Sequence, residues 1–152
     1  IISWLGRYKL NRINLICLGV KDIKASLDFY KNIGFKTYET QANPTIVFFD
    51  NQGSKLELYP IEQLAKDINA ENPPIINQGF SGITFACNTK SENEVDVILH
   101  RVEMHGGTII KPAQKAFWGG YSGYFQDLDG YYWEVAYSAD WKFDDHNMLI
   151  IE

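Results

Sequence analysis

The sequence predicts an α+β fold in which two βαβββ modules form a curved mixed sheet around a cavity, with the helices on its outer face. The same order of strand and helix patterns occurs twice along the 152 residues, and each copy ends in a strand-like segment with one glutamate, Glu57 or Glu134. The segment from Phe48 to Glu57 also matches the segment from Phe125 to Glu134, with Phe, Asp, Gly and Glu at identical spacing. Four identities at the same place in two equivalent units favour an internal duplication.

The first module covers about residues 13–60. Residues 13–20 are apolar and alternate as a strand does. Asp22 is a suitable N-cap for the next segment, whose apolar residues recur at helical spacing, and Gly34 is a suitable C-cap. Short strands separated by turn sequences are expected to complete the module at 35–40, 45–50 and 55–59.

A linker of about residues 61–80 follows, in which the weak periodicity indicates one helical turn around residues 61–68. The second module covers about residues 81–138, and its helix is expected to start at Ser91, with Glu94 as the capping-box partner. Its strands are expected at 82–87, 108–111, 121–126 and 131–137. The tail at 139–152 contains enough apolar residues to pack back on the body, so residues 1–152 are interpreted as a single domain.

Composition and charge exclude several classes of function. The net charge of -5 disfavours nonspecific nucleic-acid binding, which needs a surplus of Lys and Arg. No apolar stretch approaches the length of a membrane span, and residues 1–5 are too short for a secretory signal. The two cysteines form no Cys-x-x-Cys motif and lie in apolar runs, as buried reduced thiols do. These features favour a cytoplasmic protein.

Both glutamates are expected on the face of the sheet opposite the core. Side chains alternate across a strand, so Glu57 faces away from Leu56 and Leu58, and Glu134 faces away from Trp133 and Val135. The bulky apolar rows should lie under the helices, and the opposite face is a candidate pocket. A single strand glutamate is usually just exposed to water, but two at equivalent positions make exposure and function about equally good interpretations.

Two motifs then resemble those of a known family. The first is Val20-Lys21-Asp22 with Ser26, Phe29-Tyr30 and Gly34-Phe35; the second is Tyr124-Phe125-Gln126-Asp127-Leu128-Asp129-Gly130, leading to Trp133-Glu134. Together they resemble the opening and closing signatures of the vicinal oxygen chelate superfamily, which includes glyoxalase I, bleomycin-resistance proteins, fosfomycin-resistance proteins and extradiol dioxygenases. The resemblance implies paired βαβββ modules curled around a cavity.

The resemblance implies an incomplete metal site. The metal enzymes of the family use one position on the first strand and one on the last strand of each module. In this sequence the last-strand positions are Glu57 and Glu134, but the first-strand positions fall on Leu15 and Gly82, which have no ligand atoms. We therefore expect no cofactor and no metal-binding residues beyond these two glutamates, and a weakly held divalent metal is the disfavoured alternative.

The resemblance leaves several functions open, and it does not decide whether the protein is an enzyme. One is a metal-independent, bleomycin-resistance-like protein that binds a cationic or planar small molecule through carboxylates and aromatic rings. A second is a divergent glyoxalase-like lyase or isomerase in which Glu57 and Glu134 are catalytic. A third is an interaction module with a filled core. A homodimer is expected, without nucleic acid or membrane as partner. The candidate ligand-binding residues are Leu15, Phe49, Thr84, Trp118, Tyr121, Tyr124 and Tyr132.

Overall fold

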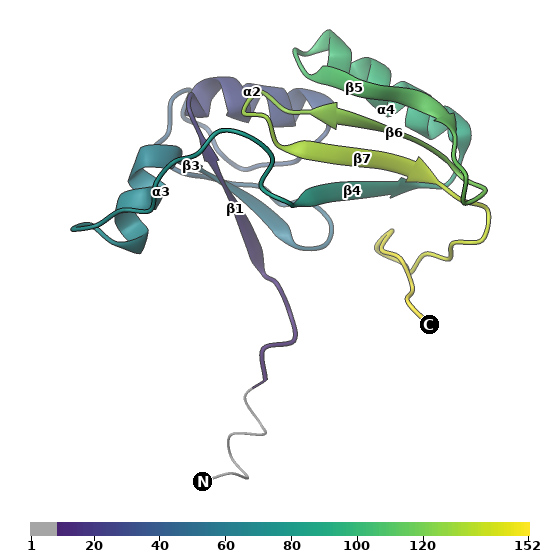
Figure 1. The fold of residues 1–152 in the computed structure, drawn as a ribbon, viewed down its shortest axis with the longest axis horizontal. Coiled ribbons are helices and arrows are strands. Elements are labelled where there is room, and N and C mark those ends of the chain that lie inside the picture. The colour runs from purple at the N-terminus through teal and green to yellow at the C-terminus, as the bar shows by residue number, and fades with distance from the viewer. Residues whose placement is uncertain (1–8) are drawn as a thin grey trace, which may run out of the picture.

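The computed structural model describes residues 9–152 and confirms the predicted α+β fold class. The expectation about residues 1–5 lies outside the described residues. Figure 1 shows helices α2 and α4 together along one side of two sheets, and the tail after β7 on the other side. The elements in chain order are β1 (Leu15–Val20), α2 (Ile23–Ile33), β2 (Val47–Phe48), β3 (Lys55–Pro60), α3 (Ile61–Ile68), β4 (Thr84–Thr89), α4 (Glu92–Met104), β5 (Thr108–Lys115), β6 (Tyr121–Gln126) and β7 (Tyr132–Tyr137).

Module one forms a three-stranded sheet in the order β1-β3-β2, with β1 parallel and β2 antiparallel to β3. The prediction of a strand at 35–40 is wrong, because these residues form no regular strand. They run beside β2 through individual bonds instead: the Thr37 hydroxyl donates to the Phe48 carbonyl at 2.7 Å, and the Asp50 N–H donates to the Lys36 carbonyl at 2.7 Å. A side-chain bond of this kind replaces the backbone ladder that a strand needs.

Module two forms a four-stranded sheet in the order β4-β7-β6-β5, in which only the β4–β7 pair is parallel. Its first strand begins at Thr84, two residues later than predicted, since Gly82 has a φ of 83° that a strand does not adopt. Strand β5 continues to Lys115, past its predicted end, with register shifts around Pro112. Over the described residues the two modules form two sheets, where the sequence predicted one curved sheet.

The helix boundaries follow from the predicted caps. The Asp22 carboxylate accepts a hydrogen bond from the Ala25 N–H at 3.1 Å, and Gly34 ends α2 with a φ of 122°. The Ser91 hydroxyl accepts from the Glu94 N–H at 3.1 Å and so caps α4. The predicted helix in the linker is confirmed as α3, which directly follows β3.

One continuous core lies between the two helices and both sheets. The Tyr30 ring on α2 lies near its centre and contacts rings of both modules, with Phe35 at 5.3 Å and Trp133 at 6.2 Å between centroids. Trp133 also stacks on Phe125 at 5.9 Å, nearly parallel. The apolar rows of β3 and β7 face this core, as predicted, and we call the opposite sides of the sheets the open faces.

A group of polar side chains, Ser26, Tyr30, Asp127 and Asp129, also joins the modules, and we call this group the latch. The buried Asp127 carboxylate accepts a hydrogen bond from the Tyr30 hydroxyl at 2.5 Å and from the Asp129 and Tyr131 N–H groups, both at 2.9 Å. Asp129 accepts from the Ser26 hydroxyl at 2.9 Å. Burial raises the pKa of Asp127, although these hydrogen bonds act in the opposite direction. The two sequence motifs therefore contact each other and hold α2 of module one on the β6–β7 turn of module two.

Among residues 9–152, no helix combines the length and apolar character needed to cross a membrane.

Candidate functional site

Glu57 lies half-buried on the open face of module one. Cys17 on β1 and Phe48 on β2 are its partners on the two neighbouring strands, so the three side chains lie side by side on one face. Burial, with smaller contributions from the negative charges of Glu57 and Asp67, raises the pKa of the Cys17 thiol to about 11. Cys17 is thus a protonated thiol beside a carboxylate, and not a reactive thiolate.

The sequence indicated that Cys17 is a buried reduced thiol, and Cys17 was not named among the candidate site residues although its row lies opposite the core. The alternation of β1 was the available signal, because Leu15, Cys17 and Gly19 form the row opposite the bulky apolar residues. Helix α3 closes one end of this face. A Cβ on Gly19 would lie 2.8 Å from the Ile61 side chain, so glycine is needed for α3 to approach β1.

Glu134 lies half-buried on the open face of module two. Tyr124 on β6 and Ala86 on β4 are its direct partners. Burial raises the pKa of the Tyr124 hydroxyl, and the adjacent Glu134 carboxylate raises it further, so this phenol stays protonated and can donate a hydrogen bond. Tyr132 shares the face two residues from Glu134, and the Phe80 ring packs edge-on against it at 5.5 Å.

The structure divides the seven predicted ligand-binding residues into three groups. Leu15, Thr84, Tyr124 and Tyr132 belong to the strand rows that carry Glu57 or Glu134. Phe49 and Tyr121 lie on the core side, where Phe49 is buried and the Tyr121 hydroxyl donates to Asp96 of α4 at 2.7 Å. Trp118, in the β5–β6 turn, stacks on Trp141 at 5.6 Å.

A one-residue difference in register explains the position of Phe49. In module one Phe48 pairs with Glu57, whereas in module two Tyr124, and not Phe125, pairs with Glu134. The match at identical spacing therefore aligns residues that face opposite sides of their sheets: Phe48 is 49% exposed and Phe125 is 2% exposed. The open-face aromatic of module one is Phe48, the neighbour of the residue that the sequence singled out.

The donor set at the open faces does not fit a resident divalent metal. Leu15 has no ligand atom, and Gly82 lies outside β4 altogether. Within the described part of the chain, no group of three or more His, Cys, Asp or Glu side chains is arranged to hold a metal ion. Glu57 and Glu134 moreover belong to different sheets. A stable site of this kind needs three or four protein ligands.

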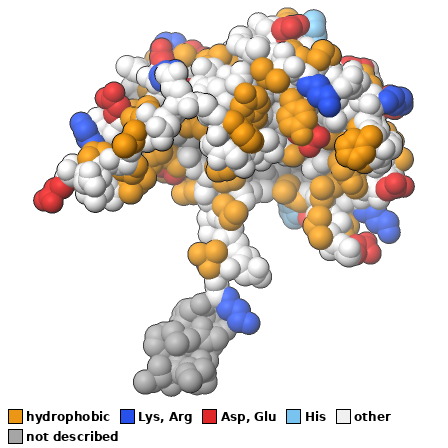
Figure 2. All heavy atoms as spheres, in the orientation of Figure 1, with side chains coloured by type: hydrophobic (Ala, Val, Ile, Leu, Met, Phe, Trp, Pro, Cys, Tyr) orange, Lys and Arg blue, Asp and Glu red, His pale blue; other side chains and the backbone are white. Residues whose placement is uncertain are grey.

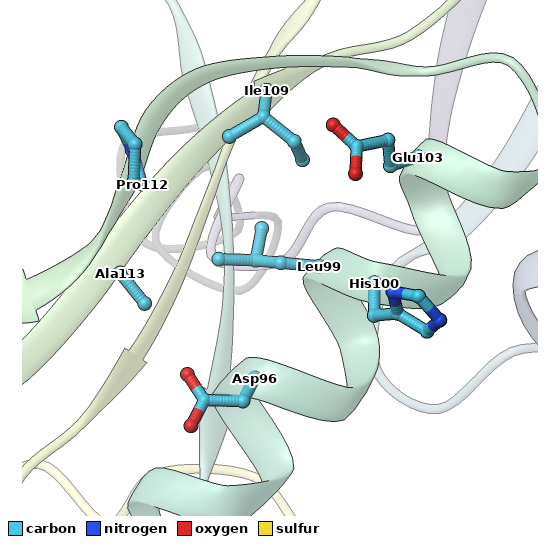
Figure 3. Close-up of a pocket in the computed structure, with 7 residues that line it drawn as sticks. All are labelled: Asp96, Leu99, His100, Glu103, Ile109, Pro112 and Ala113. Carbon is cyan, nitrogen blue, oxygen red and sulfur yellow. The ribbon is translucent and has the colours of Figure 1, made fainter.

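A groove of about 340 Å³ lies elsewhere, between α4 and β5 (Figure 3). Leu99 and Ile109 point into it, and the carboxylates of Asp96 and Glu103 lie at its two ends. None of the predicted site residues lines this groove, which is on the helix side of the sheet. We keep the two glutamates of the open faces as the candidate site, because Glu57 lies beside Cys17 and Phe48 and Glu134 lies beside Tyr124.

The surface carries no single dominant charge in the view of Figure 2. Hydrophobic side chains reach the surface across the middle of this view, and charged groups lie mostly around its edges.

The fold and the two motifs can now be compared with known proteins. The sequence model of the Glyoxalase/Bleomycin resistance protein/Dioxygenase superfamily matches residues 12–135. The chain belongs to this superfamily. The family resemblance inferred from the motifs is thereby confirmed. A search of curated protein sequences finds no match.

Solved structures of the superfamily share the fold along most of the chain. A glyoxalase-related enzyme from Fulvimarina pelagi is 27% identical, with a TM-score of 0.82 over 93% of this chain and 99% of that one. A glyoxalase/bleomycin resistance protein/dioxygenase from Nocardioides is 21% identical, with a TM-score of 0.69 over 91% and 92%. A lactoylglutathione lyase from Agrobacterium tumefaciens is 21% identical, with a TM-score of 0.64 over 90% and 100%. At these last two identities the likeness concerns the fold alone.

Proposed function

We propose that this superfamily member binds a planar or cationic small molecule on its open faces without a resident metal. The observation that carries the proposal is the pairing of the Glu134 carboxylate with the Tyr124 phenol, with Tyr132 on the same face. A carboxylate attracts a cation, and aromatic faces stack on a planar ring. The replacement of first-strand ligands by Leu15 and Gly82 supports binding that does not depend on a metal.

A titration with the planar cation proflavine, followed by its fluorescence, tests this proposal. Glu134→Gln should weaken binding about tenfold or more, because a hydrogen bond to a charged group typically contributes about 1.5–3 kcal/mol. Glu103→Gln on α4 is the matched control, since this exposed glutamate lies on the helix side and its loss should leave the affinity unchanged. Equal affinities of the unmutated protein and Glu134→Gln would refute the proposal, as would stoichiometric metal retained after dialysis.

A glyoxalase-like lyase or isomerase is the second candidate function. It is favoured by the half-burial of both Glu57 and Glu134, because a partly desolvated carboxylate is a suitable general base for an acidic C–H bond. This candidate predicts turnover of a 2-oxoaldehyde–thiol adduct that Glu134→Gln abolishes. No turnover by the unmutated protein over a panel of such adducts, with and without added divalent metal, would eliminate it.

We also propose that the protein forms a homodimer through β1 and β4. Each is an edge strand of its sheet in the described part of the chain. Exposed apolar residues lie on or beside these edges: Leu15 is 47% exposed, Ile83 58% and Phe80 66%. An apolar edge of this kind favours pairing with a second chain. Light scattering after gel filtration should give twice the 17.4 kDa chain mass, and Ile83→Lys should give the monomer.

A further inference from the structure

The tail beyond β7 folds into a compact hairpin. Phe143 and Leu149 form a β-bridge, and the Ile150 N–H donates to the Lys142 carbonyl at 2.9 Å. The Asp144 carboxylate accepts from the N–H groups of His146 at 2.8 Å and Met148 at 3.0 Å, which closes the turn. We call residues 141–150 the tail hairpin. It lies beyond the residues that the superfamily model matches, on the side of the sheets away from α2 and α4 (Figure 1).

Asn147, at the tip of the tail hairpin, connects the two modules through a single amide. Its Nδ2 donates to Oε1 of Gln52, in the β2–β3 turn of module one, at 3.2 Å. Its Oδ1 accepts from Nζ of Lys90, in the β4–α4 loop of module two, at 2.8 Å. The φ of Asn147 is 62°, a left-handed conformation that asparagine tolerates better than most residues.

Two further contacts support this connection. The Met148 side chain lies directly on Gly53, because a Cβ at Gly53 would come within 2.7 Å of the Met148 Cε. Nζ of Lys90 lies 5.4 Å from the centre of the Phe143 ring, within the range of a cation–π contact. The tail hairpin therefore contacts module two through Lys90 and module one through Gln52 and Gly53.

We propose that the tail hairpin is a strap that fixes the β2–β3 turn of module one against module two, and that Asn147 is its positioning residue. Gly53 lies two residues before the start of β3, the strand that carries Glu57. Holding this turn therefore holds one end of that strand. The latch at Asp127 ties the modules on the core side, whereas the strap ties them on the open side.

Amide hydrogen exchange by NMR tests the strap without any ligand. The reporters are the N–H groups of Lys55 and Leu56, which donate to the Asn14 carbonyl and the Asn51 side chain, both at 2.9 Å. Asn147→Gly keeps the left-handed turn but removes both amide bonds, so exchange at the reporters should become about three- to tenfold faster.

Asp145→Asn is the matched control, an exposed residue of the same hairpin, and it should leave the exchange at Lys55 and Leu56 unchanged. Unchanged exchange at these two amides in Asn147→Gly would overturn the strap. A weaker affinity of Asn147→Gly for proflavine would extend the inference to ligand binding, and that step alone rests on the proposed function. Failure of proflavine binding in the unmutated protein overturns the proposed function and leaves the exchange result standing.

Discussion

Removing one hydroxyl group from the latch should destabilise the whole domain. Tyr30→Phe keeps the ring, which is 1% exposed, and deletes an oxygen with two buried partners. That oxygen donates to Asp127 at 2.5 Å and accepts from the Trp133 indole N–H at 3.2 Å. A hydrogen bond to a charged group contributes about 1.5–3 kcal/mol, and an indole N–H left without an acceptor adds about 1 kcal/mol. The expected loss of unfolding free energy is about 3 kcal/mol.

Urea denaturation followed by circular dichroism measures this loss. With a denaturant dependence of about 1.5–2 kcal/mol per M, the midpoint should fall by roughly 1.5–2 M. Tyr38→Phe is the matched control, because the Tyr38 hydroxyl also donates to an aspartate, Asp50 at 3.3 Å, but its residue is 72% exposed. That variant should lose no more than about 0.5 kcal/mol. If both variants lost the same small amount, burial of the latch would not be the source of its strength.

Three other predictions concern the latch, the packing of β6 and the open face. Burial raises the folded-state pKa of Asp127 above 3.8, so the folded protein holds the proton of this carboxyl more tightly than the unfolded chain does. The stability gained from this proton is fully present below the unfolded pKa and is lost as pH rises through the folded pKa. The urea stability of the unmutated protein relative to Asp127→Asn should therefore change over that interval. Gly123→Ala should destabilise by about 1–3 kcal/mol in the same assay, because its Cβ would lie 2.8 Å from a carbonyl oxygen of β5. In a Cys87→Ser background, Cys17 should react with iodoacetamide at pH 8 roughly tenfold slower than an unperturbed thiol, and Glu57→Gln should speed the reaction.

The sequence predicted those parts of the fold that depend on local chemistry. Asp22, Gly34 and Ser91 marked helix ends correctly, because a cap acts within one turn of its own residue. The failures concern strand pairing. The segment at 35–40 has strand-like composition, but its partner is the two-residue strand β2, and this was not visible in the sequence. Whether a segment joins a sheet depends on its partners as well as on its own residues.

The candidate site was predicted in part, for the same reason. The alternation of side chains along each strand correctly predicted that Glu57 and Glu134 face away from the core, because the face of a strand residue depends only on its neighbours in the chain. Phe49 was named as a candidate, but its face depends on the register between β2 and β3, and in that register Phe48 is the residue opposite Glu57. Cys17 was interpreted as a buried reduced thiol from its apolar neighbours, and its alternation in β1, which places it on the open face, was not used to name it as a site residue.

The latch has a consequence for the equivalence of the two modules. Asp50 and Asp127 stand at the same place in the two sequence matches, yet Asp50 is exposed and pairs with Lys55, whereas Asp127 is buried and binds Tyr30 of the other module. The buried Tyr30 hydroxyl of module one and the buried Asp127 carboxylate of module two bind each other, so the modules are complementary and neither could be replaced by a second copy of the other.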